Sequence, residues 1–452
     1  MYSTRPPVRP HRKSSHPLAL DDLKELLSNE EIQTICHQLG HTWRNRLLPP
    51  TTTVRSMLYR SLHPDKSIKA ILAHVAAADD SLSSPPTDAA WCQARSRLPQ
   101  GLWPKLIHRS AHRLNKQVGH QYLFLGRPLY IFDGSTVSMP DRPSLAHAFG
   151  YAPVRHGPSR FPVARFTLAV QAGTNAVCEY RLGPYDESED TQFKALWDEI
   201  PSGAICLCDR KFSTYYNIAK LRRHRLDILA PLHQNRDPHR LIEKGKIIGR
   251  NQWIVPLQVT TQWRQHYHDR SLPRVIFVRL IRHTFRRHNK RQTLWLITTL
   301  LDPHLYPKSS LIRLYRRRWH IETRLDELKT TLQMNVLRSK TPEGVRSEVA
   351  ATILAHNLTW SIIHQAAERT GIAARRISFA CTLKIIVAFC ILLHHASVSG
   401  RLLVYDRMLR NIAGQTNRYR PGRTEPRRIK RDPVRYPFLR IPREQARLLG
   451  LS

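Results

Sequence analysis

Residues 314–329 read Leu-Tyr-Arg-Arg-Arg-Trp-His-Ile-Glu-Thr-Arg-Leu-Asp-Glu-Leu-Lys and carry the strongest pattern in the chain. At about 100° per residue on a helix, the leucines and the isoleucine fall on one side, where they can be buried. The stretch therefore predicts a helix, within about residues 308–332, that packs on a core and carries a line of polar groups along the core's edge. Four residues form that line: Tyr315, Arg318, Glu322 and Lys329.

A carboxylate in this line can bind a metal ion, and the cations on either side of it can hold phosphate oxygens. The angles alone do not choose between Glu322 and Asp326, which falls close to it on the helix. They also allow a simpler interpretation, in which the charged residues form a solvated surface.

Two aspartates upstream follow short apolar strands. Residues 129–132 (Leu-Tyr-Ile-Phe) predict a strand ending in Asp133, and residues 205–208 (Ile-Cys-Leu-Cys) predict a second strand ending in Asp209. The ends of neighbouring strands can bring distant acids together. A strand-end aspartate more often caps a turn, however, and Asp302 competes for the same role.

A family resemblance ranks these candidates. Tyr315, Arg318, Glu322 and Lys329 match the Y-(2)-R-(3)-E-(6)-K signature, so the chain resembles the DDE transposases of bacterial insertion sequences, in family four. Residues 131–135 (Ile-Phe-Asp-Gly-Ser) resemble that family's first-aspartate motif. Residues 208–212 (Cys-Asp-Arg-Lys-Phe) resemble the second, with Lys211 where the family usually has glycine. The resemblance covers about residues 85–440.

The resemblance implies that Asp133, Asp209 and Glu322 are catalytic and hold the metal ions. Converging carboxylates repel one another unless cations bind, and hard oxygen ligands suit two Mg²⁺ or Mn²⁺ ions. The residues implied to contact DNA are Tyr315, Arg318, Lys329 and Arg210. For Tyr315, packing beside Leu314 is an equal alternative.

The implied activity is cut-and-paste transposition. Water first frees a 3′-hydroxyl at the element end, a hairpin on the opposite strand can follow, and the 3′-hydroxyl finally attacks target DNA. The implied partners are double-stranded DNA, at the terminal inverted repeats and the target, and a second copy of the chain in a homodimer on DNA. Trp263 and Trp295 are conceivable platforms for an unpaired base, although core packing suits Trp295 better.

The composition agrees with a nucleic-acid partner. The 452 residues include 72 Lys and Arg against 34 Asp and Glu, a net charge of +38, which calls for a polyanion. The longest apolar run, residues 385–393, is far short of the ~20 residues of a spanning helix. No secretory signal opens the sequence, so we expect a cytoplasmic, nucleoid-associated protein without membrane segments. Seven scattered cysteines predict no disulfides, and Cys206 and Cys208 fit buried thiols better than a zinc site.

The expected fold is α/β, an RNase H-like catalytic core with a β-rich insertion, a helical N-terminal domain and a helical C-terminal region. The expected divisions are a helical DNA-binding region at 1–118, the first part of the core at 119–232, the insertion at 233–306, the continued core with Glu322 at 307–370, and C-terminal helices with a basic arm at 371–452. Two rival functions remain at this point. One is a metal-dependent nuclease on the same fold, and the other is an inactive transposase-derived protein that binds DNA.

Overall fold

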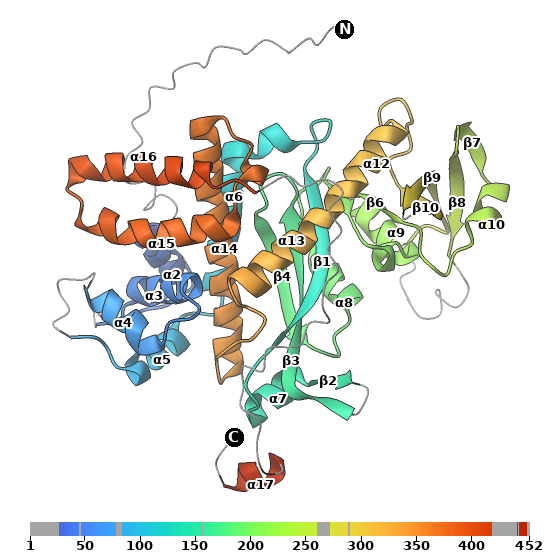
Figure 1. Ribbon diagram of the computed structural model, residues 1–452. Helices are drawn as coiled ribbons and strands as arrows, with labels where there is room; N and C mark the ends of the chain where they lie inside the picture. The colour runs from blue at the N-terminus through green and yellow to red at the C-terminus, as the bar shows by residue number, and fades with distance from the viewer. Residues whose placement is uncertain are drawn as a thin grey trace.

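The computed structural model describes residues 27–44, 47–77, 84–154, 157–259, 272–287, 290–417, 441 and 443–449. Trp263 and most of the basic arm expected at the C-terminus lie outside these residues. The described chain is a mixed α/β fold, as expected, with helices around one large central sheet (Figure 1). No helix in the described ranges is both long and apolar enough to cross a membrane.

Helices form the N-terminal part of the described chain. They are α2 (Asn29–Gln38), α3 (Pro50–Leu62), α4 (Ile68–Ala77), α5 (Asp88–Arg97), α6 (Leu102–Val118) and the 3-10 turn η1 (Gly119–Tyr122). Local capping explains where two of them begin. Ser28 accepts a hydrogen bond from the Glu31 amide at the start of α2, and Thr87 accepts one from the Ala90 amide at the start of α5.

The sheet has ten strands in the order β2-β3-β1-β5-β6-β10-β9-β8-β7, with β4 paired to β3. Strand β3 runs antiparallel to β1 and β4 runs antiparallel to β3, whereas β5 and β6 run parallel to β1. The strands are β1 (Leu129–Ser138), β2 (Tyr151–Val154), β3 (Gly157–Gln171), β4 (Val177–Pro184), β5 (Ile205–Leu207), β6 (Asp227–Pro231), β7 (Lys246–Gly249), β8 (Gln252–Gln258), β9 (Val275–Arg287) and β10 (Lys290–Thr298).

The strands expected in the insertion are present, but they extend the main sheet. Strand β10 pairs antiparallel with β6, with Ile297 opposite Ala230, and β9, β8 and β7 follow in turn. Periodicity along the sequence predicts strands but not their partners, so this continuity could not be expected from the sequence.

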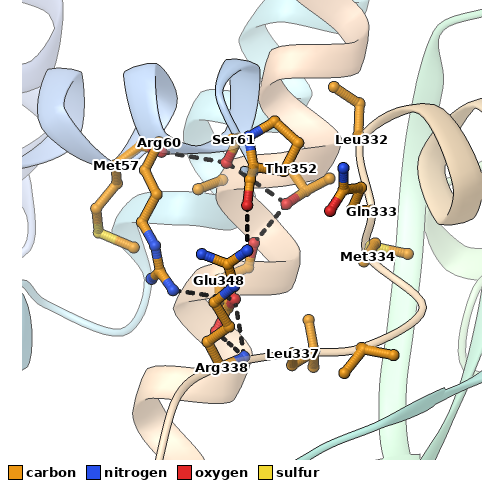
Figure 2. Close-up of a pocket in the computed structure, with 13 residues that line it drawn as sticks. Met57, Arg60, Ser61, Leu332, Gln333, Met334, Leu337, Arg338, Glu348 and Thr352 are labelled. Carbon is orange, nitrogen blue, oxygen red and sulfur yellow. Dashed lines mark hydrogen bonds and ion pairs between the residues drawn. The ribbon is translucent and has the colours of Figure 1, made fainter. Parts of the chain in front are cut away.

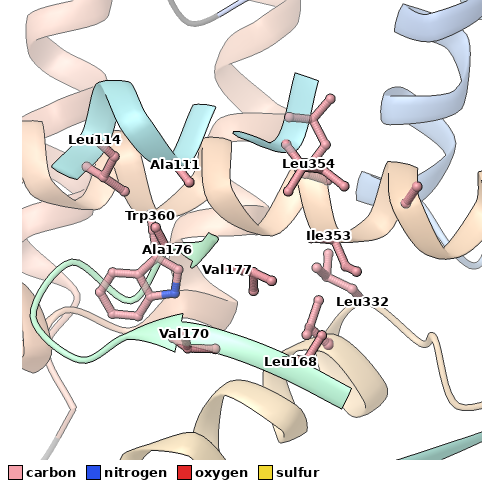
Figure 3. Close-up of a cluster of buried hydrophobic side chains, with 14 of the residues drawn as sticks. Ala111, Leu114, Leu168, Val170, Ala176, Val177, Leu332, Ile353, Leu354 and Trp360 are labelled. Atoms are coloured by element: carbon pink, nitrogen blue, oxygen red, sulfur yellow. The ribbon is translucent and has the colours of Figure 1, made fainter. Parts of the chain in front are cut away.

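Apolar clusters cover both faces of the sheet. On one face, the long helix α14 (Pro342–Thr370) packs with α6 and β4, and Leu354, Leu114 and Val177 belong to one buried cluster there (Figure 3). On the other face lie α8 (Glu189–Lys194), η2 (Trp197–Glu199), η3 (Arg210–Phe212) and α9 (Tyr215–Arg223). The remaining helices are α7 (Pro143–Phe149), α10 (Pro238–Glu243), η6 (Ala374–Arg376), α15 (Phe379–His395), α16 (Val398–Gly414) and α17 (Arg443–Leu448).

The expected regular helix over residues 308–332 is instead a chain of four segments of three helical types. It consists of α12 (Lys308–Arg316), the 3-10 turn η4 (Arg317–Trp319), α13 (His320–Asp326) and the π turn η5 (Glu327–Thr331). A 3-10 turn winds more tightly than an α-helix and a π turn more loosely, so the uniform 100° spacing fails here. The apolar side predicted for this segment is nevertheless buried, as Leu314, Ile321 and Leu328 show.

Glu348 of α14 connects the N-terminal helices to the segment that follows the π turn (Figure 2). Its carboxylate accepts from the amides of Arg338 and Ser339 and lies 3.6 Å from the Arg60 guanidinium of α3. This half-buried junction helps to fix where the chain turns from the Glu322-bearing segment into α14.

Candidate active site

Asp133 lies inside β1, not at its end as the sequence suggested. The strand continues to Ser138 because β3 pairs with it along its whole length, up to the pair Ser138–Val163. An apolar pattern marks only the buried first half of β1, since the residues from Asp133 to Thr136 are half-buried. The side chain of Asp133 accepts a hydrogen bond from the Gly134 amide at 2.9 Å.

Strand register places Asp209 next to Asp133. The last residue pair between the parallel strands β1 and β5 is Ile131–Leu207, and each aspartate lies two residues beyond it. Side chains two residues apart on a strand point to the same face, and neighbouring strands lie about 4.8 Å apart. Ile131 and Leu207 belong to the cluster that also contains Ile321. Both aspartates therefore lie on the face that α13 covers.

Burial and neighbouring charges change the pKa of Asp133. Burial raises the pKa of Asp133 to about 6, and repulsion from Asp209 and Glu189 acts in the same direction. The Gly134 amide and the Arg318 guanidinium oppose the rise but do not cancel it.

Arg318 is the group common to all three acids. Its guanidinium lies 3.8 Å from the Glu322 carboxylate and is close enough to Asp209 and Asp133 to be stabilised by both. Burial alone would lower the pKa of Arg318, yet Tyr315, Asp209 and Asp133 raise it. Glu322, on α13 next to β1 (Figure 1), thus shares the Arg318 guanidinium with the two strand acids.

The other residues of the signature are also at this site. Lys329 donates a hydrogen bond to the Ser135 hydroxyl at 2.8 Å, two residues beyond Asp133 on β1. Tyr315 is buried, which raises the pKa of its phenol, and the Arg318 guanidinium lies 5.9 Å from the centre of its ring. This burial fits the packing interpretation of Tyr315, and a contact with DNA stays a prediction.

Local contacts occupy the competing acids. Asp326 is exposed and accepts a hydrogen bond from Thr330 on its own helix at 2.8 Å. Asp302 accepts from the amides of His304 and Leu305, and these bonds lower its pKa. Asp302 therefore has the turn-capping role that the sequence left open as the simpler alternative.

The segment after Asp209 does not need the glycine that Lys211 replaces. Lys211 lies in the 3-10 turn η3, and it is absent from the described residues with positive φ other than glycine. Its side chain is exposed and pairs with Glu189 at 3.4 Å. Arg210 is exposed beside it, facing solvent next to the acids.

Glu189 is a fourth acid that the sequence did not single out. It is the first residue of α8, and a Cβ atom added to Gly134 would lie 3.1 Å from its carboxylate oxygen. Arg165 and Lys211 pair with it. Its sequence setting, Glu-Ser-Glu-Asp, reads as an ordinary helix start, so no sequence pattern could have identified it.

The donor set fits a hard divalent cation. The carboxylates of Asp133, Asp209 and Glu322 are oxygen donors of the kind that such a cation takes. A cation bound there would offset the burial and repulsion that raise the pKa of Asp133. A separate group of possible ligands, His108, Glu179 and Glu199, has donor atoms within 4.8 Å of one another but contains none of the three acids.

The family follows from a sequence comparison. Residues 125–358 match the family model described as the transposase DDE domain, a range that includes all three acids. The chain belongs to this family of transposases. It is similar to the transposase InsG for insertion sequence element IS4 of Escherichia coli (strain K12), with 24% identity over 357 residues, covering 76% of this chain and 77% of InsG. The family and the insertion-sequence type expected from the signature are thereby confirmed.

One solved structure also resembles this DDE transposase. It is the piggyBac transposase synaptic complex with hairpin DNA, with a TM-score of 0.42, 11% sequence identity, and coverage of 89% of this chain and 86% of that one.

Proposed function

We propose that this DDE transposase catalyses cut-and-paste transposition of an insertion sequence, with Asp133, Asp209 and Glu322 as its catalytic acids. The observation that carries the proposal is the register of β1 and β5, in which Asp133 and Asp209 each lie two residues beyond the last pair. It is supported by the Arg318 guanidinium, which both aspartates stabilise and which pairs with Glu322. The neighbouring Arg318 supports it, because a guanidinium near three carboxylates can also hold a phosphate oxygen.

The catalytic core is RNase H-like in this proposal. The strand order β4-β3-β1-β5-β6 supports it, with three antiparallel strands followed by two that run parallel to β1. The proposed units keep the expected boundaries, with 1–118 as a DNA-binding region, 119–232 and 307–370 as the core, 233–306 as the insertion and 371–452 as the C-terminal region.

The three acids would hold two Mg²⁺ or Mn²⁺ ions, which activate the attacking oxygen and stabilise the leaving one. Lys329 and Arg318 orient the phosphate at the element end, and exposed Arg210 contacts the DNA backbone. A water oxygen attacks phosphorus, the bond to the 3′ oxygen breaks, and that oxygen leaves as a 3′-hydroxyl. The hydroxyl is the nucleophile of strand transfer, with or without a hairpin intermediate.

The proposed partners are the terminal inverted repeats and target DNA, bound by a homodimer in the bacterial cytoplasm. The net charge of +38 supports a phosphate-rich partner. Binding should weaken steeply between about 50 and 200 mM salt, since each neutralised phosphate releases counterions. Fluorescence anisotropy with labelled repeat DNA measures this slope, and an affinity independent of salt would contradict the electrostatic argument.

The function is tested by cleavage of DNA carrying the element's flanking repeats, in Mg²⁺, by the intact protein and by Glu322→Ala. We expect cleavage at the repeat ends that the substitution abolishes while DNA binding persists. Asp326→Ala is the matched control, because it removes a neighbouring acid outside the site, and it should keep cleavage. Joined products separate a transposase from a nuclease. Tight binding without cleavage by the intact protein would instead indicate an inactive DNA-binding protein.

A further inference from the structure

Glu327 is a buried carboxylate just beyond the helix that carries Glu322. Three donors surround it. The Arg324 guanidinium lies 3.0 Å from Oε1, and His356 Nε2 and Trp360 Nε1 each lie 3.1 Å from Oε2. The exposed fractions of these side chains' residues are all at or below 9%. Oε2 of Glu327 therefore accepts two hydrogen bonds away from water, and Oε1 is paired with the Arg324 guanidinium.

Two of the three partners belong to α14, the long helix at the centre of the fold. Trp360 packs beside the sheet (Figure 3), and the Arg324 guanidinium lies 4.4 Å from the centre of its ring. A buried ion pair is weak evidence for stability, since desolvation offsets most of the attraction. Its directed hydrogen bonds, however, fix one geometry between the Glu322-bearing segment and α14.

Glu327 also opens the π turn. The Leu332 amide donates to the Glu327 carbonyl at 2.9 Å, five residues back, which widens the helix at this point. Such turns interrupt α-helices rarely and often lie at functional sites. Here the turn leaves Glu327 directed at α14 while Lys329, two residues later, reaches Ser135 on β1.

The Glu322 side chain makes few contacts with the described residues. Its side chain is 60% exposed, and among the described residues its recorded contact is the 3.8 Å ion pair with Arg318. The position of its carboxylate is therefore inherited from the backbone of α13. The buried side chains of Ile321 and Leu328 keep this segment against the core, but apolar contacts do not fix its orientation. The hydrogen bonds that Glu327 accepts from His356 and Trp360 are directional, so they can fix the orientation of the segment.

We propose that Glu327 is a positioning residue, which sets the place of the Glu322 carboxylate relative to Asp133 and Asp209 by locking the helix segment to α14. This inference rests on the proposed function, because it assigns Glu327 to the same metal site. Glu327 touches neither metal nor DNA in this role, and it acts through Glu322.

The test measures Mn²⁺ binding to the full chain without DNA. The electron paramagnetic resonance signal of free Mn²⁺ reports how much metal remains unbound. Glu327→Gln keeps the size of the side chain but turns an amide donor toward existing donors, which displaces the segment. We expect Mn²⁺ affinity to fall about 10–100-fold, the range seen when groups that orient metal ligands are lost. In the Glu322→Ala background the same substitution should cause almost no further loss, because the ligand it positions is absent.

Two further variants keep the test decisive. Trp360→Phe removes one donor and retains the Arg324 pair, so it should shift Mn²⁺ affinity in the same direction but less, even if Glu327→Gln fails to fold. Glu199→Gln is the control for the separate His108, Glu179 and Glu199 group, and it should leave the coupling between the Glu327 and Glu322 variants unchanged.

The outcomes separate the two proposals. A lower melting temperature with unchanged Mn²⁺ affinity in Glu327→Gln and Trp360→Phe would show a purely structural role and overturn the inference alone. An equal loss of affinity with and without Glu322 would do the same. If Glu322→Ala itself leaves Mn²⁺ affinity unchanged, the proposed metal site fails and this inference fails with it.

Discussion

The two strand acids and the helix acid are positioned by different means. Asp133 and Asp209 are adjacent because β1 and β5 pair in one register, and the backbone ladder enforces that register. Glu322 reaches them on a segment that changes helical type three times and is tied to α14 through side chains. Strand acids therefore depend on backbone pairing, and the helix acid depends on side-chain anchors.

The largest expected effect comes from removing the strand acids. Asp133→Asn and Asp209→Asn should each reduce cleavage of repeat-end DNA to background, since each loses a metal ligand worth several kcal/mol in the transition state. The two losses should be alike because the two positions are equivalent in register. Single-turnover cleavage measures both. Substantial cleavage by either variant would show that the two aspartates are not equivalent and that the substituted one is not a metal ligand.

A core substitution separates the two means of positioning. Leu328→Ala under the π turn and Leu229→Ala on β6 both empty fully buried positions, and each should destabilise the protein by about 2–5 kcal/mol. Under conditions where both variants remain folded, only Leu328→Ala should lose cleavage, because the cavity it leaves allows the segment that carries Glu322 to move. Urea denaturation and cleavage rates check this. Equal cleavage by the two variants would show that the helix segment does not depend on its packing.

The pH dependence of metal binding sharpens the account of Asp133. Its pKa is raised to about 6, so below pH 6 the carboxyl is protonated and cannot bind a cation. Mn²⁺ affinity should fall about tenfold per pH unit below that point and level off above it. Arg318→Gln removes an influence that lowers this pKa, so the break should move to higher pH. A profile that is flat from pH 5 to 7 would contradict the assignment.

The same pKa shift has a consequence for stability without metal. A carboxyl whose pKa is raised on folding favours the folded state at low pH, and this contribution is lost as pH rises through about 6. Asp133→Asn should therefore remove part of the loss of metal-free stability between pH 4 and pH 7. Thermal unfolding across this range, compared with the unsubstituted protein, measures the difference.

The smallest expected effect concerns the second-aspartate segment. Lys211→Gly restores the residue usual in the family but gives up an exposed ion pair, so stability should change by about 1 kcal/mol or less. Cleavage should be unchanged, because no positive φ requires glycine at this position. A strong gain in activity would show that the lysine side chain obstructs the site.

Sequence reasoning located the strands and helices near the acids but not their extents. The apolar run at 129–132 marked β1, yet the rest of the strand is polar and is held by β3, a partner that the sequence does not reveal. Residues 314–329 have continuous helical periodicity, so nothing local predicts the 3-10 and π turns. Those turns accompany contacts with β1 and α14, such as the bonds of Glu327.

The choice among competing acids was likewise beyond the sequence without the family resemblance. Asp326 and Glu322 differ little in helical phase, and they are separated by what they touch, Thr330 in one case and Arg318 in the other. Glu189 was missed because its closeness to Gly134 depends on how α8 packs against β3 and β4.

The pairing of β10 with β6 has a consequence for solubility. Without residues 233–306, β6 would present a row of unpaired backbone amides and carbonyls at the edge of the core sheet, and such an edge invites strand addition by another copy. The inserted strands occupy that edge and move the open border of the sheet outward to the short strand β7. Strands β7 to β10 should therefore also protect the protein against edge-to-edge aggregation. A chain shortened there should precipitate even though Asp133, Asp209 and Glu322 are all retained.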